Sequence, residues 1–300
     1  METSRTGVAV VDAHHHIWRR ADLEWLNGDL QPRIFGPYQP ICRDYLIEEY
    51  MAEASAAGVV ASVYCQANWP AGKAVEEVRW VSEVAAGAGF PQAIVGYCDF
   101  LRDDAGAVLR QHSAYPNVRG MRMQLHWHEN PQYRFAPEPD MMSRPAFRRN
   151  LALLQEYGWL FELQVFSGQM MEAAALAAAF PGIRFVLMHA GMPEDLSPAG
   201  MRQWRDGMLR LAELDNVCVK LSAQGTFLHR NDPDHIARIV GETVAIFGTD
   251  RCLFGSNFPI EKLWTDFASL MQAYRDATAA FGEQAQKAIL HDNARRLYRI

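Results

Sequence analysis

Short segments rich in β-branched and other apolar residues recur along the whole chain, and helical patterns lie between them. The predicted strands are residues 8–12, 59–65, 93–98, 118–125, 160–165, 184–189, 217–222 and 252–255. Strands that alternate with helices at this spacing run parallel and are joined by crossover helices. Eight such units close most naturally into a ring, so the sequence predicts an α/β fold, a (β/α)8 TIM barrel.

Helical patterns with apolar residues on one face cover residues 44–57, 74–86, 147–157, 169–180, 201–214, 233–247 and 267–280. The alternative architecture is a doubly wound open sheet, which usually carries a glycine-rich phosphate loop after its first strand. Residues 12–16 read DAHHH at that position and favour the barrel. No internal repeat and no linker rich in proline, glycine or serine interrupts the pattern, so we expect one domain over residues 1–300.

Composition narrows the classes of protein and partner. The chain is 49% hydrophobic and 21% charged, as is ordinary for a globular domain, and its net charge of −6 offers no basic surface for nucleic acid. Residues 1–7 are polar, and no apolar run reaches membrane-spanning length, so we expect neither a secretion signal nor a membrane span. Five scattered cysteines without a CxxC pair indicate reduced thiols and a cytoplasmic protein. A small-molecule substrate is the expected partner, and a homo-oligomer is compatible with the sequence.

Two histidines follow the first predicted strand at a spacing of two residues. Alternation along an extended chain places His14 and His16 on the same side and His15 on the other. Imidazoles serve as acids, bases and metal ligands near neutral pH. The alternative is a pair of rim histidines that only bond to backbone.

His189 ends the sixth predicted strand and is followed by the small residues of an Ala-Gly pair. A lone histidine in this place is more often structural. In a barrel, however, the carboxyl ends of all strands meet at one mouth. We therefore expect His189 to face His14 and His16 there.

Two connections are unusually long, and both follow a strand. Residues 17–43 carry Trp18, Trp25, Phe35 and Tyr38 among several prolines, and residues 126–145 form the second connection. Long loops in compact domains are often functional. We expect both to form the wall of a pocket, and the alternative is that they are packed surface loops.

Polar side chains at other strand ends are candidates for binding the substrate. Arg122, Gln124 and His126 follow one another at a spacing of two and share one face of the fourth strand. A guanidinium there suits a carboxylate, whereas the alternative for Arg122 is a salt bridge at the edge of the core. Gln66 and Trp69, with Asn68 between them, follow the second strand and offer hydrogen bonding and stacking, or else cap a turn.

Two residues of opposite charge, Glu162 and Lys220, lie inside predicted strands. Glu162 shares an alternating face with Gln164, so both can point into the barrel. Lys220 on the seventh strand either binds the substrate or pairs with Glu162.

Several motifs occur in a fixed order along nearly the whole chain. They are Asp12-x-His14-x-His16 with Trp18, His189 in Leu-Met-His-Ala-Gly, Val219-Lys220-Leu221-Ser222, Gly255-Ser256-Asn257-Phe258-Pro259 and Asn293-Ala294-Arg295-Arg296-Leu297-Tyr298. An HxH alone is a weak signal, but this combination resembles the lactonase branch of the amidohydrolase superfamily. The branch includes sugar-acid lactonases and pyrone dicarboxylate lactonase, with aromatic-acid decarboxylases as more distant relatives.

The resemblance implies hydrolysis of a cyclic ester. Histidines would polarise the carbonyl group, and an acidic residue after the eighth strand would activate water. It also implies that His14, His16 and His189 are the ligands if a divalent ion such as Zn²⁺ is bound. Here Asn257 replaces the family's usual aspartate, and an amide is neither a base nor a charged ligand. A metal-independent site is therefore an equal alternative.

Three interpretations of Asn257 follow. It orients the water while His189 or Glu162 acts as base, it coordinates a weakly held metal, or the site is inactive. We favour the first, and with it a lactonase acting on a small lactone that carries a carboxylate. The alternatives are a metal-dependent non-oxidative decarboxylase of an aromatic or unsaturated acid, and a barrel that binds a metabolite without turnover.

Overall fold

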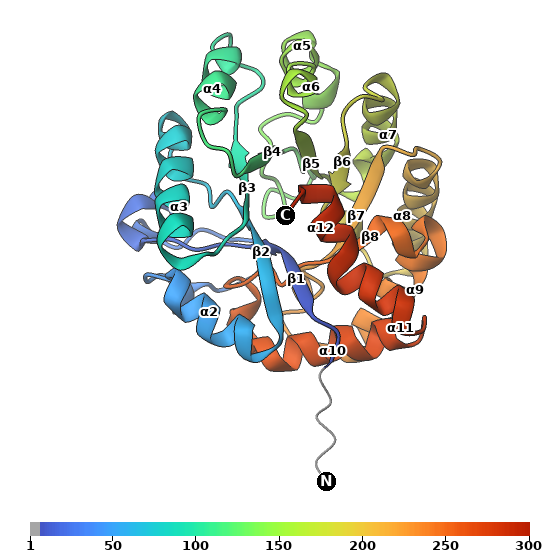
Figure 1. Cartoon of the computed structure of the whole chain (residues 1–300). Helices are drawn as coiled ribbons and strands as arrows, with labels where there is room; N and C mark the ends of the chain where they lie inside the picture. Colours follow the sequence, from blue (N-terminus) through green and yellow to red (C-terminus); the bar gives the residue numbers. More distant parts are fainter. Residues whose placement is uncertain (1–6) are drawn as a thin grey trace.

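The computed structural model describes residues 7–300 and shows eight parallel strands in the order β1 to β8 (Figure 1). The strands are β1 Val10–His15, β2 Val59–Cys65, β3 Ala93–Tyr97, β4 Val118–Gln124, β5 Leu160–Gln164, β6 Phe185–Leu187, β7 Val217–Leu221 and β8 Cys252–Phe254. The predicted (β/α)8 barrel is confirmed. The expectation that there is no secretion signal concerns the polar N-terminus, and residues 1–6 lie outside the part of the chain that the structure describes.

The ring closes between β1 and the segment that follows β8. The backbone N–H of Asn257 donates to the carbonyl of His14 (2.7 Å), and that of His16 donates to the carbonyl of Phe258 (2.8 Å). Beside them the Asp12 carboxylate accepts hydrogen bonds from the backbone N–H (2.8 Å) and the hydroxyl (2.6 Å) of Ser256. The seam of the barrel therefore runs through the two segments that carry the candidate chemistry.

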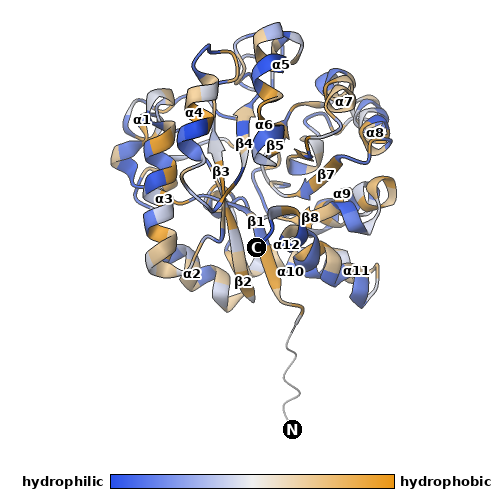
Figure 2. Cartoon of the chain, turned by 45° about the horizontal axis from the view of Figure 1, so that its top comes forward, coloured by the Kyte–Doolittle hydropathy of each residue, from blue (hydrophilic) through white to orange (hydrophobic). Residues whose placement is uncertain are grey.

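The α-helices follow the strands along the chain, and most of them surround the strands as an outer ring (Figure 1). They are α1 Glu24–Asn27, α2 Ile47–Ala56, α3 Ala74–Ala88, α4 Ala105–His112, α5 Pro145–Leu151, α6 Leu154–Tyr157, α7 Met170–Ala179, α8 Pro198–Ala212, α9 Pro233–Phe247, α10 Phe267–Ala279, α11 Glu283–Lys287 and α12 Asn293–Tyr298. In Figure 2 the hydrophobic colour follows strands such as β1 and β2, whereas the helices also carry hydrophilic colour. None of the helices within residues 7–300 has both the length and the apolar character needed to cross a bilayer.

Capping residues set the starts of two outer helices, α8 and α9. Ser197 accepts from the backbone N–H of Gly200 (3.1 Å) and Asp232 from that of His235 (3.1 Å). Each cap is followed by proline at the first helical position, where the missing N–H costs nothing. Helix α8 consequently begins three residues before the predicted 201–214 segment.

Helix α4 has no counterpart among the predicted helices because its apolar pattern is short. Only Ala105, Leu109 and His112 are buried along it. The side chain of His112 is fully buried, and one ring nitrogen lies 2.9 Å from the carbonyl oxygen of Tyr97, because α4 packs this face against the barrel.

The interior of the barrel is filled mainly by small aliphatic side chains. Val11, Val63, Val95 and Val186 form one buried cluster with Tyr298. Helix α12, which carries Tyr298, lies over the middle of the ring in Figure 1. This end of the barrel is thus covered, and the opposite end holds the site.

Candidate active site

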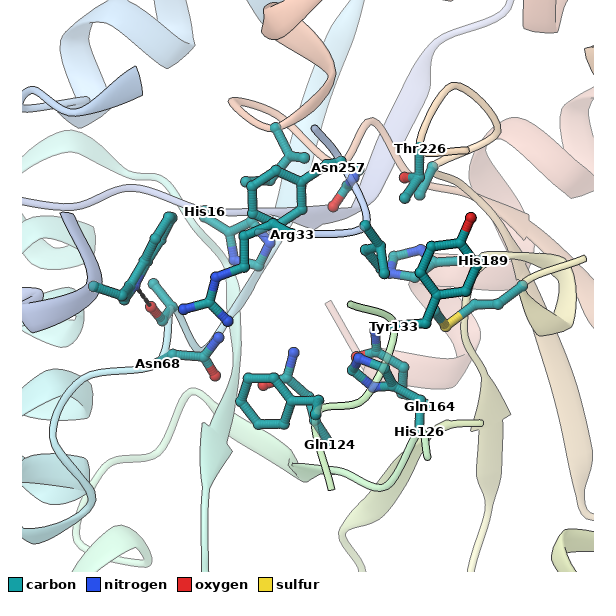
Figure 3. A pocket seen from close by; sticks show the side chains of 18 of the residues that line it. His16, Arg33, Asn68, Gln124, His126, Tyr133, Gln164, His189, Thr226 and Asn257 are labelled. Carbon is teal, nitrogen blue, oxygen red and sulfur yellow. Dashed lines mark hydrogen bonds between the residues drawn. The ribbon is translucent and has the colours of Figure 1, made fainter. Parts of the chain in front are cut away.

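A cavity of about 630 Å³ opens where the carboxyl ends of the strands meet. Figure 3 shows His16, His126, Gln164, His189 and Asn257 around it. Both long connections contribute to its wall, the first through Trp18, Trp25, Arg33 and Phe35, the second through Gln132, Tyr133, Arg134 and Phe135. The prediction that these loops form a pocket wall is confirmed.

Three imidazoles gather at this end of the barrel: His16 and His189 line the cavity, and the buried ring of His14 packs against both. The ring centroid of His14 lies 5.0 Å from that of His16 and 4.9 Å from that of His189. His15 points the other way, stacks on Tyr50 at 3.8 Å, and hydrogen-bonds the hydroxyl of Ser62 (2.9 Å). Alternation along β1 therefore places the first two histidines as predicted.

The backbone is held in an uncommon conformation at two of the site residues. His189 and Asn257 have left-handed φ angles of 57° and 58°. Histidine and asparagine adopt this region more readily than most residues, yet it still costs free energy. Such strain collects at functional sites, and here it aims both side chains at the cavity.

The three imidazoles are neutral at neutral pH. Burial is the largest cause that holds the pKa of His14, His16 and His189 well below the ordinary value. The positive charges of Lys220 and Arg122 lower these pKa values further. Neutral imidazoles have a lone pair that can accept a proton.

A buried carboxyl group, which the sequence did not reveal, lies behind Asn257. Glu261 has no exposed surface, and one of its oxygens accepts from the indole N–H of Trp264 (2.9 Å). Burial raises the pKa of Glu261 to about 7, while hydrogen bonds from Trp264 and Asn257 act to lower it. Its position one turn after Asn257 was the only signal in the sequence.

Cationic side chains face the cavity from two sides. Arg122 on β4 is buried and donates to the carbonyl of Gln66, while its Nε has no partner within residues 7–300. Gln124 and His126 follow on the same face and line the cavity, as predicted. Arg33, which the sequence analysis missed, enters from the first long loop, and its Nε is also buried and without a partner in the described chain.

The other predicted binding residues divide into two groups. Trp25, Trp69 and Gln164 line the cavity, and the Trp69 indole nitrogen and a Gln164 oxygen lack partners among the described residues. The side-chain oxygen of Gln66 instead accepts from the backbone N–H of Asn68 (2.7 Å). Gln66 therefore caps a turn, which is the structural alternative considered for it.

Glu162 and Lys220 lie beneath the floor and form an ion pair. The Lys220 Nζ is 2.5 Å from a Glu162 oxygen, and neither side chain has exposed surface. Glu162 also accepts from the hydroxyl of Tyr298 (2.7 Å) and from the thiol of Cys65 (3.0 Å). With its oxygens occupied and no surface in the cavity, Glu162 is not placed to take a proton from water, and Lys220 is not placed to bind a substrate.

One group of candidate metal ligands occurs within the described residues. A nitrogen of His14, the sulfur of Cys65 and an oxygen of Glu162 lie within 4.8 Å of one another. Lys220 Nζ contacts all three, at 3.4 Å from His14 Nδ1, 3.6 Å from Cys65 Sγ and 2.5 Å from Glu162. Zinc needs such ligands at about 2.0 to 2.3 Å, so this group holds an ammonium and does not fit a divalent ion beside it.

The expected ligand set of three histidines differs from that group. His14 belongs to both sets, but His16 and His189 do not contribute to the group around Lys220. Metal binding by His14, His16 and His189 stays a prediction.

Comparisons with known proteins agree with this architecture. The chain is 34% identical over 298 residues to the uncharacterised protein y4mH of Sinorhizobium fredii, covering 98% of this chain and 99% of that protein. It is 26% identical over 309 residues to an L-fucono-1,5-lactonase of Burkholderia multivorans, covering 98% and 97% of the two chains. A zinc-bound crystal structure of an amidohydrolase from Burkholderia multivorans superposes with a TM-score of 0.81 at 24% identity, covering 97% and 99%.

A sequence model of the amidohydrolase family also matches the chain. It covers residues 11–300, from β1 through the last helix, and so includes all the site residues described above. The chain therefore belongs to the amidohydrolase family.

Proposed function

We propose that this amidohydrolase is a lactonase that opens a small cyclic ester with water. The observation that carries the proposal is the meeting of three neutral imidazoles, of which His16 and His189 line the cavity and His14 packs against both of them from below. Membership of a hydrolase family and the similarity to an L-fucono-1,5-lactonase support the reaction class.

The substrate in this proposal carries a carboxylate. Neither Arg33 nor Arg122 forms a salt bridge with any residue of the described chain, although both line the cavity. Leaving a buried donor without a partner is costly, and the cost is larger for a charged group. A carboxylate would satisfy these guanidinium groups with charge-assisted hydrogen bonds.

The reaction needs a base, a polarised carbonyl group and a proton for the leaving group. The Nε2 of His16 or His189 takes a proton from water as the water oxygen attacks the lactone carbonyl carbon. A hydrogen-bond donor stabilises the negative charge that develops on the carbonyl oxygen. The ring C–O bond then breaks, the imidazolium returns the proton to the departing oxygen, and the product is a hydroxy acid.

Asn257 orients the attacking water in this scheme and transfers no proton. Its side chain lines the cavity, and its backbone is fixed by the hydrogen bond to His14 across the seam. No step in this scheme is routed through a metal, and His14, His16 and His189 stay the predicted ligands of a divalent ion if one is bound.

A panel of lactones with and without ring carboxylates, monitored with a pH indicator, tests the proposal. We expect proton release from carboxylate-bearing lactones, unchanged by a chelator, and only a modest rate change in Asn257→Asp. Binding without proton release for every lactone would indicate a metabolite-binding barrel and would refute the lactonase. Activity that is lost with the chelator and restored by zinc would refute the metal-free mechanism.

A further inference from the structure

The environment of His14 Nδ1 shows which of its ring nitrogens carries hydrogen. Two groups lie near this atom, the ammonium of Lys220 at 3.4 Å and the sulfur of Cys65 at 3.4 Å. An ammonium has three donors and no lone pair. It can therefore only donate to Nδ1.

The thiol hydrogen of Cys65 is used elsewhere. Cys65 lies 3.0 Å from Glu162 and donates to this carboxylate, which has no hydrogen of its own. Lys220 then directs its three hydrogens to Glu162, to the Cys65 sulfur and to His14 Nδ1. A hydrogen on Nδ1 would have the Cys65 sulfur as its acceptor, but it would face the ammonium hydrogens and leave Lys220 with an unused donor. A neutral imidazole in this place therefore carries its single hydrogen on Nε2.

His16 has the opposite arrangement. Its Nδ1 lies 2.7 Å from the backbone carbonyl oxygen of Cys65, an atom that only accepts. His16 therefore carries its hydrogen on Nδ1, and its Nε2 has a free lone pair. The two histidines of the HxH motif thus present a hydrogen and a lone pair, respectively, to the same region.

We infer that Lys220 is a positioning residue that fixes His14 as the Nε2–H tautomer. The inference deepens the proposed lactonase and rests on it for its catalytic consequence. The ring of His14 packs against those of His16 and His189, which line the cavity, and its Nε2 is buried and has no partner in residues 7–300. In this inference that Nε2 donates to the carbonyl oxygen of a lactone bound between the three rings. His16 Nε2 accepts the proton of the attacking water. The ammonium acts through His14 and does not touch the substrate.

The first test is a tautomer measurement on the full-length wild-type protein. Histidine labelled with ¹⁵N at both ring nitrogens is observed by NMR near pH 7, and His14→Gln and His16→Gln assign the two signals. We expect hydrogen on Nε2 of His14 and on Nδ1 of His16. Hydrogen on Nδ1 of His14 would overturn the inference. Since no substrate is needed, this result is independent of whether any lactone is hydrolysed.

The second test removes the ammonium. Lys220→Met alone leaves Glu162 buried without its cation and can prevent folding, so the double variant Lys220→Met/Glu162→Gln is used as well. In the folded double variant the hydrogen of His14 should move to Nδ1, toward the Cys65 sulfur. The kcat should fall about 10²- to 10³-fold with little change in KM, as expected when one donor to an oxyanion is lost. A folded double variant that keeps hydrogen on His14 Nε2 would refute the role of Lys220, whatever its kcat.

A matched control separates this role from the general loss of a paired lysine. Lys262 pairs with Glu49 (2.6 Å) and Glu53, is partly buried, and does not line the cavity. Lys262→Met should leave the His14 signal as in the wild type. A change of tautomer in this control would show that the signal follows any loss of charge, and would count against Lys220.

Discussion

The two ends of the barrel reach left-handed backbone conformations with different residues. Where helices lead back into strands, glycines such as Gly58 and Gly248 take positive φ angles at no steric cost. Where strands end at the cavity, Asn68, His189 and Asn257 do so, with φ angles of 60°, 57° and 58°. At these positions the covered end uses residues that take positive φ angles without strain, whereas the cavity end retains strained residues that place side chains.

The cavity and the layer of side chains beneath its floor also differ in how completely their polar atoms are hydrogen-bonded. Buried nitrogens of Arg33, Arg122 and Trp69 lack partners in the described chain at the cavity. Beneath the floor, Glu162 accepts from three donors and Lys220 contacts three acceptors. Unsatisfied polar atoms indicate where a ligand completes the structure, whereas saturated ones indicate where the structure supports itself.

The largest effect is expected from a substitution at the cavity end. His189→Asn should lower kcat about 10²- to 10⁴-fold, the usual contribution of an acid or base, with an unchanged unfolding midpoint. Asparagine tolerates the left-handed backbone of this position. Steady-state kinetics and thermal unfolding measure the two effects, with His291→Asn outside the cavity as the control. A large loss of stability would contradict the idea that the cavity residues serve the reaction while the residues beneath the floor support the fold.

A substitution beneath the floor should mainly lower the stability of the fold. Glu162→Gln leaves the buried ammonium of Lys220 without its counter-charge and should destabilise the protein by about 3 to 5 kcal/mol. Urea unfolding measures this loss, and Glu213→Gln in an exposed ion pair should change stability by less than about 1 kcal/mol. An unfolding free energy equal to that of the wild type would show that the pair does not support the fold.

A smaller effect should separate binding from chemistry at the cavity. Arg33→Met should raise KM for a carboxylate-bearing lactone about 10- to 100-fold and leave kcat nearly unchanged, since a hydrogen bond to a charged group contributes about 1.5 to 3 kcal/mol. An uncharged lactone serves as the internal control, and its KM should not move. Equal effects on both substrates would rule out recognition of the carboxylate by Arg33.

The smallest effect concerns pH and the buried carboxyl groups near the cavity. Burial raises the pKa of Glu77 and of Glu261 from 4.5 to about 7. The stability that these protonated groups contribute is present below pH 4.5 and is lost as pH rises through 7. Urea unfolding at several pH values should show this decline, and Glu261→Gln should reduce it. A stability that rises between pH 5 and 7 would argue against protonated carboxyls.

Local periodicity made much of this molecule predictable. Alternation along β1 placed His14 and His16 on one side, and the same rule placed Gln124 and His126 at the cavity wall. Parallel strands brought His189 to the same end. Each of these inferences needed only the spacing of residues and the direction of a strand.

Other features depend on contacts between distant segments and leave no local pattern. Arg33 lies in a loop whose path the sequence does not determine, and the burial of Glu261 depends on the packing of Trp264 beside it. The pairing of Glu162 with Lys220 was one of two alternatives, because the sequence could not show how deep in the barrel each side chain lies. The burial of His112 was not predictable because the short helix that buries it has too few apolar residues to be recognised.

The seam between β1 and the segment after β8 also has a consequence for how the protein acquires activity. His14 and Asn257 are joined there by a backbone hydrogen bond although 242 residues separate them in the chain. Contacts of such long sequence separation are costly in loop-closure entropy and form late in folding. Turnover should therefore appear only after the last step of refolding, and recovery of catalysis would report completion of the native state more strictly than recovery of helix content.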